Sequence, residues 1–461
     1  MHFPLPELDI NSRSWLRIPP EVDVPVTERV RKILDTSAMQ RLRHISQLGL
    51  VSLVYPGAVH TRFEHCLGVY RWACLAVRHL LSTDRNFAEQ TSQIELKVFL
   101  LAALLHDVGH WPYCHAIEDL RLTDLPRHER LARQLICSAP LAEVITQQWS
   151  VSPEQVADFI AGTTEQGEAG SVLRNLLSGP VDIDKLDYLQ RDSLHAGVPY
   201  GRNFDAGRLL SSLCVGEDGR SIAITEKGKT AAEMMVFARY VMFSEVYWHH
   251  TVRSATAMLQ RLVFLLRERI VSERWLNCSE GDFGNQLVQL ARAHPQAQPL
   301  ATSLFGDQRS LYKRLAQTTL DESPQVFDAV ARRPYTDLVE LSRRLAERLS
   351  RQLSRPLGDE DVLIDAPPVK LEVQFQVAVR HAKNAKRPEL VKGDDSRLGE
   401  SCDYGFVPLS SISPVVHALA TDQFDNFVKR IRVFISPARA ADVRLSQPQV
   451  IEALLSVATE D

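Results

Sequence analysis

Apolar residues recur every three or four positions along much of the chain, which is the spacing of an amphipathic helix. The pattern extends over residues 27–48, 63–81, 94–105, 128–136, 180–194 and 230–275. The last of these stretches contains neither glycine nor proline. Polar connectors separate the stretches, and one of them holds Asp218-Gly219, a dipeptide typical of a hairpin turn. These features predict a mainly helical body.

The pattern changes near residue 366. Apolar residues alternate with polar ones over residues 369–379, and a shorter alternation covers residues 431–435. Alternation with a period of two predicts strands with one buried face. We therefore expect a mainly α fold with a small C-terminal α+β unit. The expected organisation is a Pro-rich wrapping segment at 1–26, a helical domain at 27–365 and the α+β unit at 366–461.

Composition narrows the class of protein. The chain has 461 residues, 45% of them hydrophobic, which is enough for a large core. Its 53 basic and 57 acidic residues give a formal net charge of −4, so no nucleic acid or membrane partner is indicated. The seven cysteines are odd in number and lack CxxC spacing, as expected for reduced thiols in a cytoplasmic protein. The N-terminus lacks the apolar core of a signal peptide, and the most apolar run, 98–105, is shorter than the roughly 20 residues of a membrane span.

One apolar helix ends in residues that carry chemistry. The stretch 96–105 is apolar nearly all round, so the helix is expected to be buried, and it leads directly into His106 and Asp107. A buried carboxylate is costly unless it meets a metal ion or a cation. The alternative is a core histidine with an aspartate that caps the helix end, because ion-pair networks imitate functional sites.

Two further elements bring similar groups. His65 lies at the start of another apolar helix, at 63–81. A third helix carries Asp184, Tyr188 and Asp192 on one face, with Lys185 on its flank. That face is more polar than simple packing requires, which favours a site assembled from distant parts of the chain.

His65, His106, Asp107 and Asp184 match, one for one, the pattern of the HD superfamily of metal-dependent phosphohydrolases, which the sequence therefore resembles. Four longer motifs are similar, in order and wording, to deoxynucleoside triphosphate (dNTP) triphosphohydrolases. They are RLRHISQLG at 41–49, YPGAVHTRFEHCLG at 55–68, HDVGHWPYCH at 106–115 and DIDKLDY at 182–188. That group includes bacterial dGTPase-like enzymes and the SAM-and-HD-domain enzyme. The resemblance covers roughly residues 30–260 and implies an HD-domain helical core.

The resemblance implies one divalent transition metal, such as Mn, Fe or Zn, on His65, His106, Asp107 and Asp184, with Mg accompanying the nucleotide. Mixed nitrogen and oxygen ligation fits such a metal. His115 is implied as the acid that protonates the leaving 5′-oxygen, and Glu118 as the carboxylate that orients it. The other catalytic candidates are His110, His128 and Glu129.

The resemblance also assigns a substrate pocket. Arg62, Lys185 and Arg239 take phosphate-binding positions, and Gln47 and Leu48 take deoxyribose-binding positions. Tyr247 is implied as the wall that excludes a 2′-hydroxyl, with Tyr188 and Asp192 around the sugar and phosphates. A solvated helix charge explains Arg239 equally well, and core packing explains Leu48 and Tyr247 nearly as well.

The resemblance further suggests regulation. Asp35, Gln40 and Arg43 match positions near which the SAM-and-HD-domain enzyme binds regulatory nucleotides, and we therefore expect a homo-oligomer, a dimer or tetramer. The expected reaction is hydrolysis of a dNTP to deoxynucleoside and tripolyphosphate. One alternative is the same metal site acting on a nucleoside monophosphate, an alarmone or a cyclic nucleotide. Another is a nucleotide-sensing protein without turnover.

Overall fold

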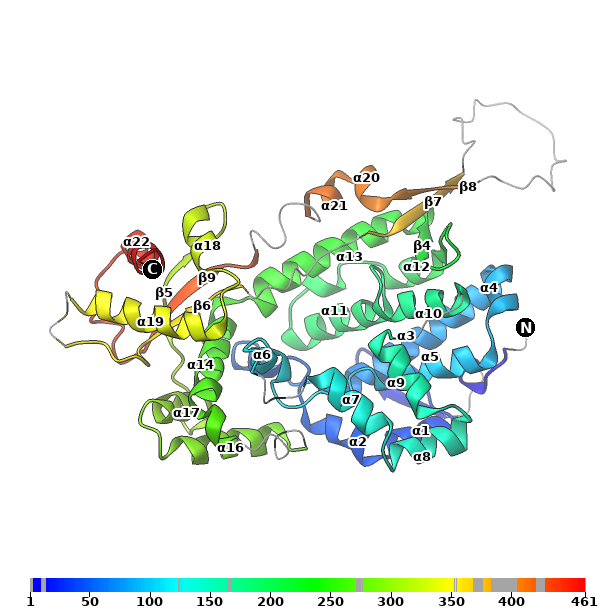
Figure 1. Ribbon diagram of the computed structural model, residues 1–461. Helices are drawn as coiled ribbons and strands as arrows, with labels where there is room; N and C mark the ends of the chain where they lie inside the picture. The colour runs from blue at the N-terminus through cyan, green and yellow to red at the C-terminus, as the bar shows by residue number, and fades with distance from the viewer. Residues whose placement is uncertain are drawn as a thin grey trace, which may run out of the picture.

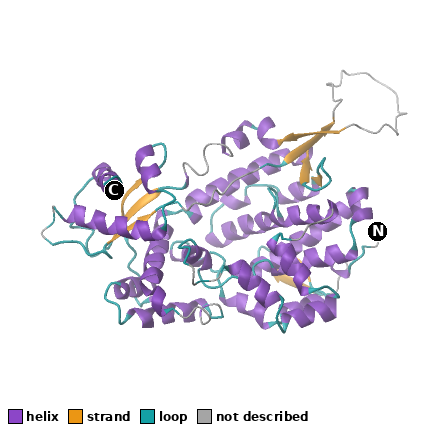
Figure 2. Cartoon of the chain, in the orientation of Figure 1, coloured by secondary structure: helices purple, strands orange, loops and turns teal. Residues whose placement is uncertain are grey.

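The computed structural model describes residues 3–9, 14–122, 125, 127–163, 168–270, 275, 277–351, 353, 355–367, 376–382, 404–419 and 428–460. Helices dominate these residues and the strands are short (Figure 2), so the prediction of a mainly α fold is confirmed. No helix within these ranges combines the length and the apolar character that crossing a membrane requires. The described cysteines are all free thiols, and Cys402 lies outside the described residues.

The larger, helical part of the chain forms the body (Figure 1). Its helices are α1 (Glu28–Leu34), α2 (Ser37–Arg41), α3 (Arg62–Thr83), α4 (Arg85–Gln90), α5 (Gln93–Leu105), α6 (Cys114–Glu118), α7 (His128–Ile136), α8 (Leu141–Val144), α9 (Pro153–Ala161), α10 (Glu168–Ser178), α11 (Ile183–Ala196), α12 (Ala206–Ser211), α13 (Lys229–Met242), α14 (His250–Leu266), α16 (Glu280–Ala291) and α17 (Ala297–Phe305).

Three helices form the centre of the body. Helix α3 packs against both α5 and α11. Helix α5 is buried from Leu96 to Leu105 apart from Lys97, which is partly exposed, as its apolar sequence predicts. Ser92 begins α5 with a capping box, so its first backbone amide groups have hydrogen-bond partners. The packing fixes where the ends of these three helices meet, and the candidate residues lie at those ends.

The apolar stretch at 230–275 forms two helices. Helix α13 passes into a π-helical turn at Phe243–Tyr247. The helix ends there, at Trp248, and α14 begins at His250. The Trp248 carbonyl lies outside the helix and accepts a hydrogen bond from Arg432 Nη2 at 2.9 Å. Arg253 also lies over the Trp248 ring, at 4.4 Å from its centroid. The carbonyl at the break thus has a partner far along the chain, which periodicity does not reveal.

The C-terminal strands belong to two separate sheets. Strands β5 (Lys313–Thr318), β9 (Ile431–Ile435) and β6 (Val362–Asp365) form an antiparallel sheet in that order. Helices α18 (Pro324–Val330), α19 (Tyr335–Ser350) and α22 (Gln447–Ala458) pack with this sheet around a separate core. The α+β unit therefore includes strands and helices that precede the expected boundary at 366.

The second sheet belongs to the body. The predicted hairpin at Asp218-Gly219 joins β3 (Leu213–Val215) to β4 (Ile222–Thr225), and Gly219 adopts φ +66°. Strand β7 (Ala378–Ala382) pairs in parallel with β4, and β8 (Tyr404–Pro408) pairs with β7. Of the strand predicted at 369–379, residues 369–375 lie outside the described residues. Helices α20 (Leu409–Ile412) and α21 (Pro414–Ala418) follow β8.

The N-terminal segment contains a short hairpin, β1 (Trp15–Ile18) and β2 (Val22–Pro25), which packs on α3. The carbonyl of Pro19, between the two strands, accepts a hydrogen bond from Arg191 Nη1 at 3.1 Å. The segment thus reaches the residues behind the candidate site.

Candidate active site

Three helix ends converge at the site. Thr61 caps α3, which places His65 in the first turn of that helix. Helix α5 ends at Leu105, so His106 and Asp107 follow at its buried C-terminal end. Asp182 caps α11 and places Asp184 in its first turn.

The structure brings the four predicted metal ligands together. His65 Nε2 lies 3.0 Å from Asp184 Oδ1 and 3.2 Å from His106 Nε2. His106 Nε2 in turn lies 3.5 Å from Asp107 Oδ1 and 3.8 Å from Asp184 Oδ1. The ligand atoms of His65, His106 and Asp107 are mutually close enough to hold one ion.

Hydrogen bonding fixes the tautomers of both imidazoles. His106 Nδ1 faces the Ala103 carbonyl at 3.0 Å and must donate to it, because a carbonyl oxygen only accepts. His65 Nδ1 donates in the same way to Asp187 Oδ2 at 2.9 Å. In the neutral rings each Nε2 therefore carries a lone pair, and the two lone pairs face each other beside two carboxylates. These residues fit a divalent cation, since a cation is what four acceptors at this distance require.

The charges lead to the same conclusion. Burial lowers the pKa of His65, but hydrogen bonds and charges of Asp184 and Asp187 outweigh it and raise that pKa to about 10. Burial favours a raised pKa for Asp107, yet its electrostatic interactions with His110, His106 and Arg62 hold that pKa well below its usual range. The site therefore attracts positive charge.

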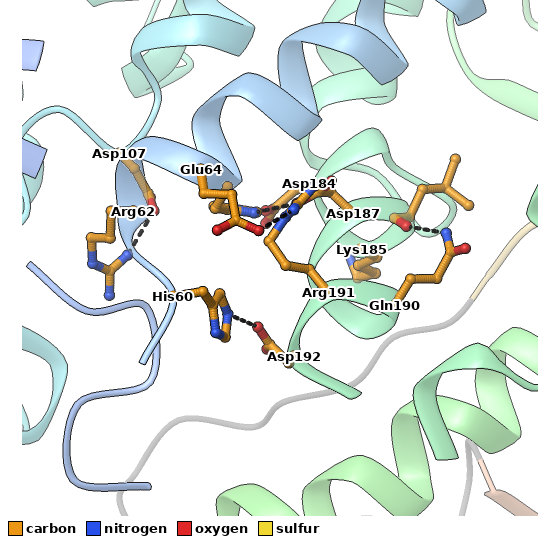
Figure 3. A network of polar contacts seen from close by, with 12 residues as sticks. His60, Arg62, Glu64, Asp107, Asp184, Lys185, Asp187, Gln190, Arg191 and Asp192 are labelled. Carbon is orange, nitrogen blue, oxygen red and sulfur yellow. Dashed lines mark hydrogen bonds and ion pairs between the residues drawn. The ribbon is translucent and has the colours of Figure 1, made fainter. Parts of the chain in front are cut away.

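Glu64, Asp187 and Arg191 form a polar network (Figure 3), which supports His65 through Asp187. Asp187 accepts from Arg191 Nε at 2.8 Å and from Arg191 Nη2 at 2.7 Å, in addition to His65. Arg191 Nη1 donates to Glu64 Oε1 at 2.6 Å, and His195 Nε2 contacts the same oxygen at 2.9 Å. This chain of contacts orients the metal-facing nitrogen of His65.

Arg62 lies directly beside the four ligands. Its Nη1 donates to Asp107 Oδ2 at 2.6 Å, as Figure 3 shows, and its side chain is buried. Its Nε is also buried and has no hydrogen-bond partner among the described residues. The guanidinium thus keeps an unused donor next to the ligand cluster.

Three imidazoles form a second cluster next to Asp107. His110 Nδ1 donates to the Asp107 carbonyl at 3.2 Å, so His110 Nε2 is an acceptor. His115 Nε2 lies 3.0 Å from that acceptor and must therefore carry the proton. The His115 side chain is exposed, whereas His110 is buried. The His128 ring lies 4.2 Å from the His110 ring, measured between centroids.

Glu118 orients a different histidine from the expected one. Its carboxylate accepts from the backbone N of His128 at 2.6 Å and from His128 Nδ1 at 2.9 Å. The expected partner was His115, which contacts His110 instead. The reason is local, because His128 begins α7 and its backbone amide has no partner within that helix. Glu129 lies farther away, at 3.7 Å from His128 Nδ1.

Three of the residues expected around the sugar contact one another. Tyr247 donates its hydroxyl to Asp192 Oδ2 at 2.6 Å, and its ring lies 6.5 Å from that of Tyr188. Gln47 is fixed by its backbone, which donates to the His60 carbonyl at 2.9 Å. The side-chain oxygen of Gln47 is buried and finds no hydrogen-bond partner in the described part of the chain. Leu48, next to it, packs partly buried against the core.

The other two predicted phosphate-binding residues differ in their surroundings. The Lys185 ammonium donates to the Gly179 carbonyl at 2.9 Å and pairs with Asp182, the cap of its own helix. Its charge is thus already neutralised within α11. The Arg239 guanidinium lies 5.4 Å from the centroid of the Phe243 ring. Burial raises the pKa of both Tyr188 and Tyr247, and the charge of Arg239 opposes that rise.

The predicted effector residues lie together at the end of α1 and along α2. Asp35 is the exposed C-cap of α1, and Gln40 Nε2 donates to the Leu34 carbonyl at 2.7 Å. Arg43 Nε donates to Gln40 Oε1 at 2.9 Å, and its guanidinium lies 3.8 Å from the centroid of the Phe63 ring.

Sequence reasoning missed several participants. His60 is buried, donates from Nε2 to Asp192 Oδ1 at 2.8 Å and stacks on His195 at a centroid distance of 4.3 Å. Both His60 and Asp187 lie inside the motifs, so their position was a usable signal. Glu280 contacts Ser46 from 234 residues away, and no sequence pattern indicates that contact.

The geometry can be compared with known proteins. Residues 62–192 match the model of the HD domain, and residues 204–392 match that of the HD associated region. The uncharacterized protein YwfO of Bacillus subtilis is 36% identical over 232 residues, which are 50% of this chain and 50% of YwfO. Human deoxynucleoside triphosphate triphosphohydrolase SAMHD1 is 32% identical over 250 residues, which are 47% of this chain and 39% of SAMHD1. This chain belongs to the HD superfamily of metal-dependent phosphohydrolases.

Solved structures share the fold over nearly the whole chain. A phosphohydrolase from Bacteroides thetaiotaomicron superposes with a TM-score of 0.66 at 21% identity, covering 92% of this chain and 100% of that one. A hypothetical protein from Aquifex aeolicus gives 0.63 at 24% identity, covering 96% and 99%. The chain spans half or less of the length of the two curated relatives, so the likeness to them concerns the HD region.

Proposed function

We propose that the protein hydrolyses dNTPs to deoxynucleoside and tripolyphosphate. Water attacks the α-phosphorus, the bond between that phosphorus and the 5′-oxygen breaks, and the 5′-oxygen leaves with a proton as the nucleoside hydroxyl. Tripolyphosphate carries away the oxygen of the water. By its likeness to dGTPase-like enzymes, dGTP is the substrate to try first.

One observation carries the proposal: two buried polar atoms, one on the turn before α3 and one on the first residue of α3, have no partner among the described residues. Gln47 Oε1 is an acceptor and suits a sugar hydroxyl, whereas Arg62 Nε is a donor and suits a phosphate oxygen. A buried polar atom without a hydrogen bond costs about 1–3 kcal/mol, which a bound ligand relieves. A ligand with a sugar at one end and phosphates at the other meets both requirements.

The proton for the leaving oxygen comes from His115 in this proposal. In the free site His115 Nε2 carries a proton, since it faces the acceptor nitrogen of His110, but desolvation and the charge of Arg62 lower the pKa of His115 to about 3. In this proposal the negative charge of the bound triphosphate favours a second proton on the ring, and the imidazolium then donates from Nε2. Transfer to the leaving 5′-oxygen makes that oxygen a better leaving group. His128, held by Glu118, adds a further imidazole for the phosphates.

Phosphate charge is met by side chains on two sides. Arg62 approaches from α3, and its planar guanidinium suits bidentate contact with phosphate. Lys185 and Arg239 contribute from α11 and α13; Lys185 leaves Asp182 for the phosphate in this proposal, and a triphosphate is a stronger partner than one carboxylate. The Tyr247–Asp192 pair closes the sugar side against a 2′-hydroxyl.

The metal is held by His65, His106, Asp107 and Asp184. A divalent ion bound there supplies Lewis acidity to the phosphoryl group and lowers the pKa of bound water. Mixed nitrogen and oxygen donors favour Mn, Fe or Zn, and Mg accompanies the nucleotide.

Regulation by nucleotide is part of the same proposal. Arg43 and Asp35 are exposed near the start of the domain, where they are open to an effector or a second copy of the chain. We expect a homo-oligomer that dNTP stabilises, and sedimentation with and without dGTP measures it. The free thiols agree with a cytoplasmic setting.

The direct experiment resolves the products. Metal-loaded protein is incubated with each dNTP and the phosphates are separated by anion exchange, beside the Asp107→Ala variant. Tripolyphosphate supports the proposal. Release of only orthophosphate or pyrophosphate contradicts it and favours another substrate class, and saturable dNTP binding without turnover favours a sensor.

A further inference from the structure

The turn that carries Gln47 is held from outside by a helix of the HD associated region. Ser46 donates to Glu280 Oε1 twice, from its backbone N at 3.1 Å and from Oγ at 2.6 Å. Ser46 Oγ also accepts from the backbone N of Gly49 at 2.9 Å. Glu280 is the first residue of α16, and its carboxylate thus holds Ser46, whose hydroxyl in turn closes the turn to Gly49.

The other side of the same turn is tied to the metal site. The backbone N of Gln47 donates to the His60 carbonyl at 2.9 Å, and the backbone N of Arg62 donates to the Ile45 carbonyl at 3.0 Å. These contacts set the distance of Gln47 from α3. The Glu280 contacts hold the Ser46 end of the turn from α16.

Helix α16 also contacts the segment that carries the imidazoles. The Phe283 ring lies 5.6 Å from the Tyr113 ring, and Tyr113, at φ +56°, immediately precedes α6. Tyr113 packs closely on the turn as well, because a Cβ at Gly49 would meet its ring at 3.0 Å. Phe283 and Glu280 thus place one helix against both the sugar side and the acid side of the site.

Glu280 is not needed to begin its own helix. Ser279 caps α16 by accepting from the backbone N of Asp282 at 3.1 Å, and Asp282 Oδ2 accepts from Ser279 Oγ at 2.7 Å. The Glu280 side chain is directed to Ser46 instead. Burial raises the pKa of Glu280, whereas the hydrogen bonds from Ser46 and the charge of Arg62 oppose that rise. The carboxylate is therefore kept close to the substrate loop at some cost in desolvation.

We propose that Glu280 is a positioning residue that fixes Gln47 to accept a hydrogen bond from the 3′-hydroxyl of the deoxyribose. The inference rests on the proposed dNTP substrate. The 3′-hydroxyl is the one donor that the sugar of a dNTP offers, and Gln47 Oε1 is the unpartnered acceptor on the turn. Glu280 acts through Ser46 and touches no substrate itself.

The test compares dGTP with 2′,3′-dideoxy-GTP, which lacks that hydroxyl. In the unaltered, metal-loaded protein kcat/KM for dGTP should exceed that for the dideoxy compound about tenfold, the effect of one hydrogen bond. Glu280→Ala should lower this ratio to near one, chiefly through KM for dGTP. Glu280→Gln should restore it, because the amide oxygen accepts both hydrogen bonds from Ser46.

Two further variants complete the design. Asp282→Ala weakens the same helix turn without touching Ser46 and should keep the full ratio. Ser46→Ala removes the link from the other end and should lower the ratio even if Glu280→Ala does not fold. A full ratio in Glu280→Ala or Ser46→Ala overturns the inference alone. An unaltered protein that acts on neither nucleotide overturns the proposed function, and the inference with it.

Discussion

Asp187→Asn tests whether the residues behind His65 tune the metal site. Asp187 accepts three hydrogen bonds, one from His65 Nδ1 at 2.9 Å and two from Arg191. Asparagine has a single acceptor oxygen, so its amide group must face one of these donors. If it faces His65, the imidazole proton moves to Nε2, the nitrogen directed at the metal.

The expected magnitude follows from this geometry. The variant replaces a buried, charged hydrogen bond, worth about 1.5–3 kcal/mol, by a neutral one worth about 0.5–1.5 kcal/mol. Residues in this position change metal affinity by about 10–100-fold, which is about 1.4–2.8 kcal/mol. We expect a loss in that range, with the fold retained.

The assay measures the dissociation constant of Mn²⁺ by competition with a chelator, and unfolding of the metal-free protein checks stability. Asp158→Asn is the matched control, because Asp158 also pairs with an arginine, Arg133, but at a half-exposed site. Its metal affinity should equal that of the unaltered protein. Unchanged affinity in Asp187→Asn would refute the role given to the network.

Three other predictions concern the ligands, the sugar wall and the fold. Asp107→Ala should lose bound metal, measured by elemental analysis, together with hydrolysis; full activity would refute the metal assignment. Tyr247→Phe removes the hydroxyl that Asp192 accepts at 2.6 Å and should lower kcat/KM for dGTP about tenfold; an unchanged value would remove Tyr247 from the wall. Asp365→Ala leaves the buried Arg253, its partner at 2.5 Å, without a carboxylate. The change should lower the free energy of unfolding of the metal-free protein, measured in urea, by about 3–5 kcal/mol. A loss below about 1 kcal/mol would show that the pair contributes little to the stability of the fold.

Much of the helical body could be predicted because its helices bury a continuous apolar face. The apolar stretch at 96–105 forms most of the buried helix α5, and the residues that follow it reach the site. The four predicted metal ligands lie close together because each is placed near a helix end within a local motif. Their role as metal ligands stays a prediction.

Long-range contacts could not be predicted in the same way. The break at Trp248 is contacted by Arg432, and the turn at Ser46 by Glu280, each distant in sequence. Strand β5 joins its sheet only through β9, more than a hundred residues later. Lys185 matched a phosphate-binding position, yet its ammonium pairs with Asp182, a contact that the motif contains but does not reveal.

Hydrolysis of dGTP in ¹⁸O-labelled water tests the central claim most directly. Mass spectrometry of both products locates the oxygen that the water supplied. Attack at the α-phosphorus predicts one ¹⁸O atom in tripolyphosphate and none in deoxyguanosine. Label in deoxyguanosine, or products limited to pyrophosphate and the nucleoside monophosphate, would contradict the proposed reaction.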